Sequence, residues 1–375
     1  MDLGEEKIFR AAILNIPRIG SQRLRRILAF YGSAQNAWEA KGKRCSEFGD
    51  NSWLKDFFQA REKIDPEKVG LRLKRENISL VALGEEKYPC LLAECPDAPP
   101  LLFYKGVLKR GQEGLAIVGS RRATPYGKAA ASYLAKTLVE SDYVIVSGLA
   151  RGIDTAAHQG AIEGNGITWA FLAGGLDNIY PAENINLARI IMEKGALISE
   201  YPPGMPAESG HFPARNRLIS GSSRGVIVVE AAQRSGSLIT ADFALEQGRE
   251  VFAVPGPIFS EQSRGTHNLL KMGAKLVAEK GDIFGELPLF SNIETMVKAD
   301  EKPCRDDCTP IGKNEKDKNW EIILRFLSDL PLHIDRLTAL CPLPAYEIAL
   351  GLLELQLAGE IIQMPGQHYV LDRRN

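Results

Sequence analysis

The stretch LAIVGSRRATPYG, residues 115–127, decides the fold. An apolar run ends in Gly119-Ser120-Arg121-Arg122, and a helix is expected to begin at Pro125. The same order returns in YVIVSGLARGID, residues 143–154, with a helix near Ile153. Similar runs follow as ITWAFLAGG, GALISEY, GVIVVEAA, REVFAVPG and AKLVAE. Continuous apolar runs that alternate with helices predict an α/β fold, an extended Rossmann-like doubly wound, mainly parallel sheet.

Four parts are expected along the chain. Residues 1–65 predict a small N-terminal helical domain, 66–289 the Rossmann-like core, 290–319 an exposed charge-rich linker and 320–375 a C-terminal winged helix. In the first part, a Pro-Gly turn before Ser21 and a helix with Arg23, Arg25 and Arg26 have the pattern of a helix-hairpin-helix or SAM-like unit. A helical bundle with a solvated basic face is the favoured alternative.

The winged helix is predicted from three helices and a terminal hairpin that turns at Pro365-Gly366. Its second long helix places Glu347 and Glu354 on the outer face. A helix that reads duplex DNA needs Arg, Lys or Asn there. We therefore expect this part to contact protein, or to bind DNA only weakly.

The overall charge excludes a broadly basic nucleic-acid binder, because the 375 residues carry a net charge of −1. Any positive site must be local. No basic leader and no apolar run of membrane-spanning length is found, so a cytoplasmic protein is expected. Six cysteines suit a reducing compartment. Neither Cys90 and Cys95 nor Cys304 and Cys308 have zinc-knuckle spacing, and no metal is expected.

Arginine-bearing segments follow several strands, and right-handed crossovers bring such loops to one edge of the sheet. Between Leu115 and Arg151 there are five basic and two acidic residues. We expect loop glycines, helix amides and guanidiniums to hold phosphates there, and Phe212 to stack on a base. The candidate residues are Gly119, Ser120, Arg121, Arg122, Gly148, Arg151, Phe212, Arg215, Asn216, Arg217, Gly236 and Ser237.

The alternative for each arginine is an ion pair, with Asp154 and Glu230 as candidate partners. Phosphate binding is favoured for Arg121, Arg215 and Arg217, which are expected on loops at a solvent-facing edge. Arg151 is left open between phosphate binding and a structural pair with Asp154.

Nucleotide cofactors and catalysis are not expected. The glycines after Gly119 do not match the dinucleotide fingerprint, and the next strand ends in Ser147 rather than an acidic residue. A Gly-Lys-Ser phosphate loop is absent, and no nucleophile with a base stands out. His158, in AAHQGAI, is expected to be a packed core histidine. We predict a protein without cofactor that is not an enzyme.

The chain resembles the bacterial DNA-processing protein A family (DprA, also called Smf). The motifs are IVGSRRAT (117–124), IVSGLARGIDTAAHQGA (145–161), LAGGLDNIYPAENINL (172–187), ISEYPPG (198–204), FPARNRLISG (212–221), SGSLITADFALEQGREVFAVPG (235–256) and GTHNLL (265–270). The resemblance implies a core that binds single-stranded DNA as a homodimer, protects incoming strands and loads the RecA recombinase in natural transformation. By motif, Gly119, Ser120, Arg121, Phe212, Arg215, Asn216 and Arg217 would bind the strand, with Gly148 and Gly236 shaping the pocket.

Two alternatives come from other classes. The core is also similar to Rossmann-like nucleotide phosphoribohydrolases, but the Pro-Gly-Gly run of those enzymes is absent from Arg234-Ser235-Gly236-Ser237. A duplex-DNA regulator that acts through the winged helix is the other alternative, and the acidic face of that helix disfavours it.

Overall fold

The computed structural model describes residues 4–40, 52–287 and, with gaps, 320–371. The chain forms two compact units, Met1–Phe290 and Ser291–Asn375, and each is described by itself. The segment expected to be a linker, residues 290–319 with Cys304 and Cys308, lies outside the described residues. The division of the first unit at residue 65 remains a prediction.

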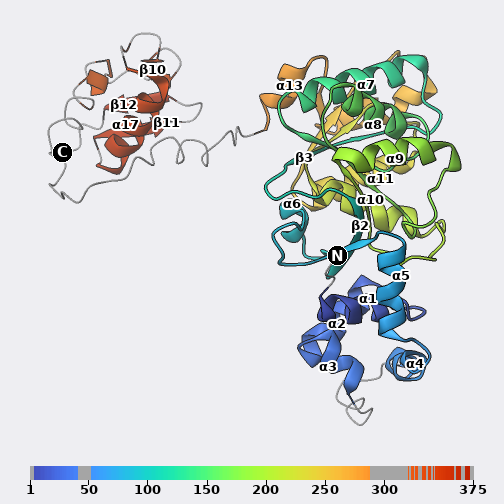
Figure 1. The fold of residues 1–375 in the computed structure, drawn as a ribbon. Coiled ribbons are helices and arrows are strands. Elements are labelled where there is room, and N and C mark those ends of the chain that lie inside the picture. Colours follow the sequence, from blue (N-terminus) through green and yellow to red (C-terminus); the bar gives the residue numbers. More distant parts are fainter. Residues whose placement is uncertain are drawn as a thin grey trace. The chain divides into compact units, whose positions relative to one another are not determined.

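A nine-stranded sheet forms the centre of the first unit, with the order β1-β2-β6-β5-β4-β3-β7-β8-β9 (Figure 1). Its strands are β1 (Ser79–Ala82), β2 (Leu101–Gly106), β3 (Gly114–Val118), β4 (Val144–Ser147), β5 (Thr168–Phe171), β6 (Ala196–Ser199), β7 (Ser223–Val228), β8 (Glu250–Ala253) and β9 (Lys275–Leu276). β1 is antiparallel to β2, and β2 is antiparallel to β6. The other pairings, which join the strands from β3 to β9, are all parallel. The expected mainly parallel, Rossmann-like sheet is confirmed.

The chain reverses its direction of winding at the middle of this sheet. From β3 it proceeds through β4 and β5 to β6, and it then returns to the other side of β3 with β7 and β8. The loops that follow β3 and β7 therefore diverge at the carboxyl edge. In open α/β sheets, such a switch point leaves a crevice where ligands bind.

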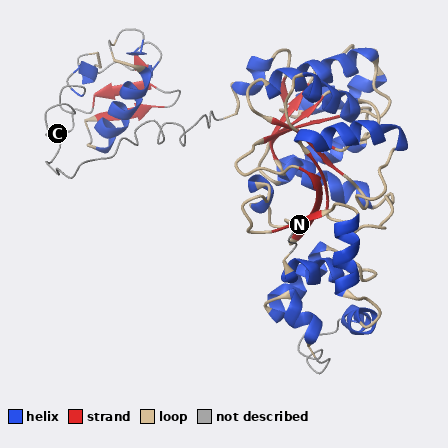
Figure 2. Cartoon of the chain, viewed as in Figure 1, coloured by secondary structure: helices blue, strands red, loops and turns tan. Residues whose placement is uncertain are grey.

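Helices cover both faces of the sheet, as Figure 2 shows. One face packs against α7 (Pro125–Val139), α8 (Ile153–Glu163), α9 (Ile185–Lys194) and α13 (Lys280–Phe284). The other packs against α6 (Cys90–Ala93), α10 (His211–Gly221), α11 (Gly236–Glu246) and α12 (Arg264–Lys271). Buried Val, Ile and Ala side chains on alternate strand positions fill both layers.

Two helix starts lie where the sequence places them. α7 begins at Pro125, because proline suits the first helical turn and the Thr124 side chain accepts a hydrogen bond from the Gly127 N–H. α8 begins at Ile153, directly after Gly152, whose φ of 78° suits glycine.

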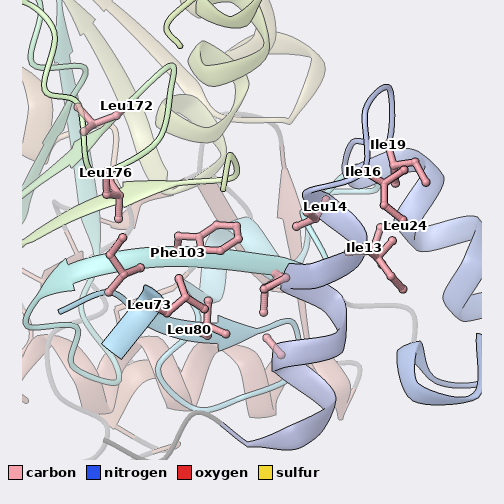
Figure 3. Close-up of a cluster of buried hydrophobic side chains, with 14 of the residues drawn as sticks. Ile13, Leu14, Ile16, Ile19, Leu24, Leu73, Leu80, Phe103, Leu172 and Leu176 are labelled. Carbon is pink, nitrogen blue, oxygen red and sulfur yellow. The ribbon is translucent and has the colours of Figure 1, made fainter. Parts of the chain in front are cut away.

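The N-terminal helices share a hydrophobic cluster with the sheet. They are α1 (Glu5–Leu14), α2 (Ser21–Tyr31), α3 (Ala34–Glu39), α4 (Ser52–Arg61) and α5 (Pro66–Arg75). Ile13, Leu14 and Leu24 from these helices belong to the same hydrophobic cluster as Phe103 and Leu172 from the core (Figure 3). The predicted small helical domain thus shares a hydrophobic cluster with the core.

The second unit contains a three-stranded sheet in the order β10-β12-β11 and one long helix. The strands are β10 (Leu332–His333), β11 (Ile361–Met364) and β12 (His368–Leu371), and the helix is α17 (Ala345–Leu357). Ile348, Leu352 and Leu355 of this helix are buried. The predicted turn at Pro365-Gly366 lies among the undescribed residues.

Within the described parts of both units, none of the helices is long and apolar enough to cross a membrane.

Candidate nucleic-acid interface

Two adjoining hollows lie at the carboxyl edge of the parallel strands. The first, of about 230 Å³, lies beside the loops that follow β3, β4 and β5. The second, of about 520 Å³, lies between the diverging loops after β3 and β7. Both are lined by Arg121, Arg122, Ala150, Phe212 and Arg215. We call the two hollows together the edge groove.

Arg121 and Phe212 lie where the hollows meet. The Arg121 guanidinium lies 4.8 Å from the centre of the Phe212 ring, in cation–π contact. Phe212 also makes an edge-on contact with Tyr180, with ring centres 6.2 Å apart. Arg121 is exposed and makes no carboxylate ion pair among the described residues. An exposed guanidinium beside aromatic faces can take a phosphate and leave a ring for a base.

Arg215 is buried beneath this contact, with a relative exposure of 4%. Its Nη1 donates to the carbonyl oxygens of Gly148 at 2.5 Å and Phe171 at 2.6 Å. Its Nε donates to Asn216 Oδ1 at 3.1 Å. Burial lowers the pKa of Arg215 to about 10, and the neighbouring charge of Arg121 acts in the same direction. The sequence places Arg215 at a solvent-facing edge, and this is wrong, because its fork is held by buried carbonyls.

Glycine is required at position 148, because the Arg215 side chain lies against its backbone. A Cβ at this position would come within 2.0 Å of the Arg215 Nη1 atom. The Gly148 and Ala150 amides donate to Asp154 Oδ2 at 3.1 and 3.3 Å, so this carboxylate holds the loop after β4. Burial raises the pKa of Asp154, and the Arg215 charge opposes that rise. The two charges act on each other without a direct ion pair.

The backbone amides of the loop after β3 are used internally. Ser120 N–H donates to Glu230 O at 2.7 Å, and Arg122 N–H donates to Ser120 Oγ at 3.0 Å. Thr124 N–H donates to Glu230 Oε2 at 2.9 Å, which places a carboxylate at the N-terminus of α7. These three amides therefore have partners within the protein, and the exposed guanidiniums of Arg121 and Arg122 carry the positive charge of this loop. Glu230 pairs with Thr124, not with the arginines proposed as its partners.

Residues 211–217 form the start of a helix, not the expected loop. α10 begins at His211, and Pro213 falls in its first turn, where a missing N–H is tolerated. Because successive helical residues are rotated by 100°, Phe212, Arg215 and Asn216 share one face and Arg217 points elsewhere.

Arg217 does not line the edge groove. Its Nη2 donates to Glu200 Oε2 at 2.6 Å, and its Nη1 lies 3.2 Å from Asp97 Oδ2. Its expected position at the solvent-facing edge is wrong, because a buried carboxylate holds it on the other side of α10.

The remaining candidates lie around the groove. Arg151 is exposed and pairs with Glu183 at 2.8 Å, so the alternative pair with Asp154 is wrong. Asn216 donates to Gly236 O at 3.2 Å and joins α10 to α11. The second hollow is also lined by Gly119, Ser120, Asn216, Gly236 and Ser237.

Sequence reasoning missed the groove residues Tyr180 and Asn178, whereas Arg234 belongs to a loop that the sequence already singles out. Tyr180 is 54% exposed and lines the first hollow with Asn178, while Arg234 lines the second. Tyr180 and Asn178 lie in the quoted stretch 172–187, after β5, and Arg234 lies after β7. Their positions after parallel strands are the signal that could have indicated them.

The histidine and the cysteines that the sequence singles out have no place in the groove among the described residues. His158 is fully buried, as expected, with Nδ1 2.7 Å from Thr168 Oγ1, and burial lowers its pKa to about 3. Cys90 and Cys95 are free cysteines. In the described ranges, no cluster of three or more His, Cys, Asp or Glu could hold a metal ion.

The fold and the groove define a Rossmann-like α/β protein with an arginine- and aromatic-lined crevice at its switch point. The chain belongs to the DNA recombination-mediator protein A family, whose sequence model matches residues 79–288. A second match, to the DprA winged helix domain, covers residues 313–367 and confirms the predicted fold of the C-terminal part.

Relatives match over most of the chain. Protein Smf of Synechocystis is 32% identical, covering 97% of this chain and 98% of its own. Protein Smf of Escherichia coli is 40% identical, with 80% and 79% covered. The crystal structure of DNA processing protein A from Streptococcus pneumoniae is 36% identical with a TM-score of 0.66, covering 76% of this chain and 99% of that one.

Proposed function

We propose that the chain binds single-stranded DNA in the edge groove and acts as a binding protein without catalysis. The observation that carries the proposal is Arg215, a buried guanidinium without a direct carboxylate partner, which lines both hollows. A buried charge of this kind is costly unless it is compensated. Asp154 acts on this guanidinium without a direct ion pair, and a phosphate at the groove would add a negative charge beside it.

Single strands match the groove better than a duplex does. Arg121, Arg122 and Arg234 offer guanidiniums, and Phe212 and Tyr180 offer aromatic faces. Unpaired bases stack on such faces for about 1–3 kcal/mol each, whereas the bases of a duplex are already stacked. The only carboxylate lining either hollow in the described residues is Asp154, whose Oδ2 accepts two amides. This donor set suits binding and offers no acid–base pair.

The family gives the proposal its cellular setting. We infer that the protein works in the cytoplasm as a homodimer in DNA processing during transformation, protecting incoming strands and loading RecA. The Smf and DprA relatives support this setting through the shared family.

A competition assay tests the proposal. Full-length protein is titrated into fluorescent oligo-dT by anisotropy, with unlabelled single strand or duplex of equal length as competitor. The single strand should displace the probe at far lower concentration. Equal competition by the duplex, or no binding of oligo-dT, would refute the proposed function. Light scattering at micromolar concentration checks the dimer, and a 41.2 kDa species alone would remove that part. RecA loading is measured as faster RecA filament growth on strands precoated with the protein.

A further inference from the structure

Helix α10 is held from two sides. On the groove side, Arg215 donates to the carbonyls of Gly148 and Phe171. Two residues further, Arg217 points away from the groove and donates to Glu200, which is 6% exposed. The helix that carries Phe212 into the groove is thus fixed in rotation by a contact outside the groove.

That outside contact belongs to the N-terminal helices. Ser21 Oγ, at the start of α2, donates to Glu200 Oε2 at 2.7 Å, the same oxygen that Arg217 binds. One carboxylate oxygen therefore joins α2 to α10. Burial raises the pKa of Glu200, and the charge of Arg217 and the hydroxyl of Ser21 oppose that rise.

A second set of contacts also joins α2 to α10, through residues 96–98. Arg25 lies four residues after Ser21, on the same face of α2, and donates to the carbonyls of Pro96 and Ala98. Between these two residues, the carbonyl of Asp97 accepts from Arg217 Nη1 at 2.8 Å. Residues 96–98 thus accept hydrogen bonds from Arg25 of α2 and from Arg217 of α10.

Apolar packing also connects the N-terminal helices to the edge groove. Leu24 of α2 belongs to the hydrophobic cluster that includes Leu172 (Figure 3). Leu172 also lines the first hollow. From α5, Arg72 Nη2 contacts Asp177 Oδ2 at 3.1 Å, and Asp177 lies next to the groove residue Asn178. The N-terminal helices therefore contact the segment after β5, which lines the first hollow.

We propose that Ser21, Glu200 and Arg217 are positioning residues for the strand site, through which the N-terminal helices set the affinity of the groove for single-stranded DNA. The inference rests on the proposed function. Arg217 acts through the orientation of α10 and does not touch the strand. Releasing α2 from Glu200 lets α10 move, and Phe212 and Arg215 then hold the strand less well.

The salt dependence of binding separates positioning from direct contact. A lost phosphate contact flattens the log–log slope by about 0.7 for single strands. A lost positioning residue weakens binding and leaves the slope unchanged, because the number of phosphates neutralised is the same. Arg121→Ala is the reference for a direct contact.

The main variant replaces both partners, Glu200→Gln with Arg217→Met, because removing Arg217 alone would leave a buried carboxylate uncompensated. The matched control is Glu113→Gln with Arg224→Met. The arginines of the two pairs have comparable burial, with Arg224 17% exposed against 13% for Arg217, although Glu113 is more exposed than Glu200. The control pair lies at the amino ends of β3 and β7, at the opposite edge of the sheet. Ser21→Ala is a milder variant that changes no charge, and Arg217→Lys tests rescue.

The experiment titrates each full-length variant into fluorescent oligo-dT at several salt concentrations, with folding checked by circular dichroism. The double variant should raise Kd about three- to tenfold at unchanged slope. Ser21→Ala should raise Kd less than the double variant does, and the control pair should leave Kd unchanged. Arg217→Lys keeps the positive charge, so its affinity should lie between those of the parent chain and the double variant. An unchanged Kd in the double variant overturns the inference, as does a slope flattened by about 0.7, which would make Arg217 a phosphate contact. If the double variant does not fold, an unchanged Kd in Ser21→Ala overturns it. Absence of oligo-dT binding by the parent chain, in contrast, removes the proposed function itself.

Discussion

Helix α10 of the first unit and helix α17 of the second carry different side chains on their accessible faces. α10 presents Phe212 and Asn216 to the edge groove and holds Arg215 beneath it. α17 has no Lys or Arg in its sequence and exposes Tyr346, Leu350 and Leu353, each more than half exposed. A helix without Lys or Arg, such as α17, cannot neutralise phosphates.

The contrast shows that a winged-helix fold does not by itself indicate a DNA-reading surface. Function follows from the side chains that a fold presents, and the site that we propose for phosphate binding lies in the Rossmann-like core. The exposed leucines of α17 agree with the expectation that the winged helix contacts protein. The following variants test this division, from the largest expected effect to the smallest.

Arg215→Ala should have the largest effect. It removes a buried charge at the groove, so single-strand affinity should fall by about 2–5 kcal/mol. It also leaves the carbonyls of Gly148 and Phe171 unpaired, so the free energy of unfolding should fall by about 1–3 kcal/mol. Anisotropy and thermal unfolding measure the two effects. A folded Arg215→Ala protein with parental affinity would show that the edge groove does not bind the strand.

Phe212→Ala should weaken binding by about 1–3 kcal/mol through lost stacking, with a nearly unchanged salt slope. Tyr133→Ala is the matched control, because Tyr133 is 59% exposed on α7 and lines neither hollow. Equal affinities for the two variants would contradict a stacking role. Titrations at several salt concentrations give both quantities.

Glu183→Gln should strengthen binding slightly. Glu183 forms an ion pair with the exposed guanidinium of Arg151, and Arg151 lines the first hollow. Its removal frees one cation for a phosphate, so the salt slope should steepen by up to about 0.7. Weaker binding by this variant would mean that the pair itself holds the loop in its binding shape.

Removal of the winged helix, in a chain that ends at Asn319, should have the smallest effect. Oligo-dT affinity should stay within a few-fold of full length, because the groove lies entirely in the first unit. Anisotropy measures it, with circular dichroism as the folding check. Loss of binding by a folded truncation would move the strand site, in whole or in part, to the second unit.

The sequence predicts the sheet, the edge and two helix starts because these depend on local signals. Gly and Pro after apolar runs mark where strands end and where α7 and α8 begin. The start of α10 was expected to be a loop, whereas the structure shows a helix with Pro213 in its first turn, where proline is tolerated. The position of Arg217 depends on Ser21 and Glu200, which are brought together from 179 residues apart, and no local pattern encodes such a contact.

Burial also separates the arginines that the sequence treats alike. Arg121 and Arg215 both belong to basic, glycine-containing stretches, yet one is exposed and the other is 4% exposed. The difference comes from Gly148, whose missing side chain makes the space for the Arg215 guanidinium. Gly148 lies 67 residues from Arg215 in the sequence, so no local pattern indicates that packing.

The most direct test of the central claim is the salt dependence of oligo-dT binding by Arg121→Ala. Arg121 is exposed, so its removal should leave the fold intact and flatten the log–log slope by about 0.7, the value for one lost phosphate contact on a single strand. Arg121→Lys should keep the slope and recover only part of the affinity, because an ammonium loses the bidentate fork. Parental affinity and slope in Arg121→Ala would contradict the assignment of the edge groove as the strand-binding site.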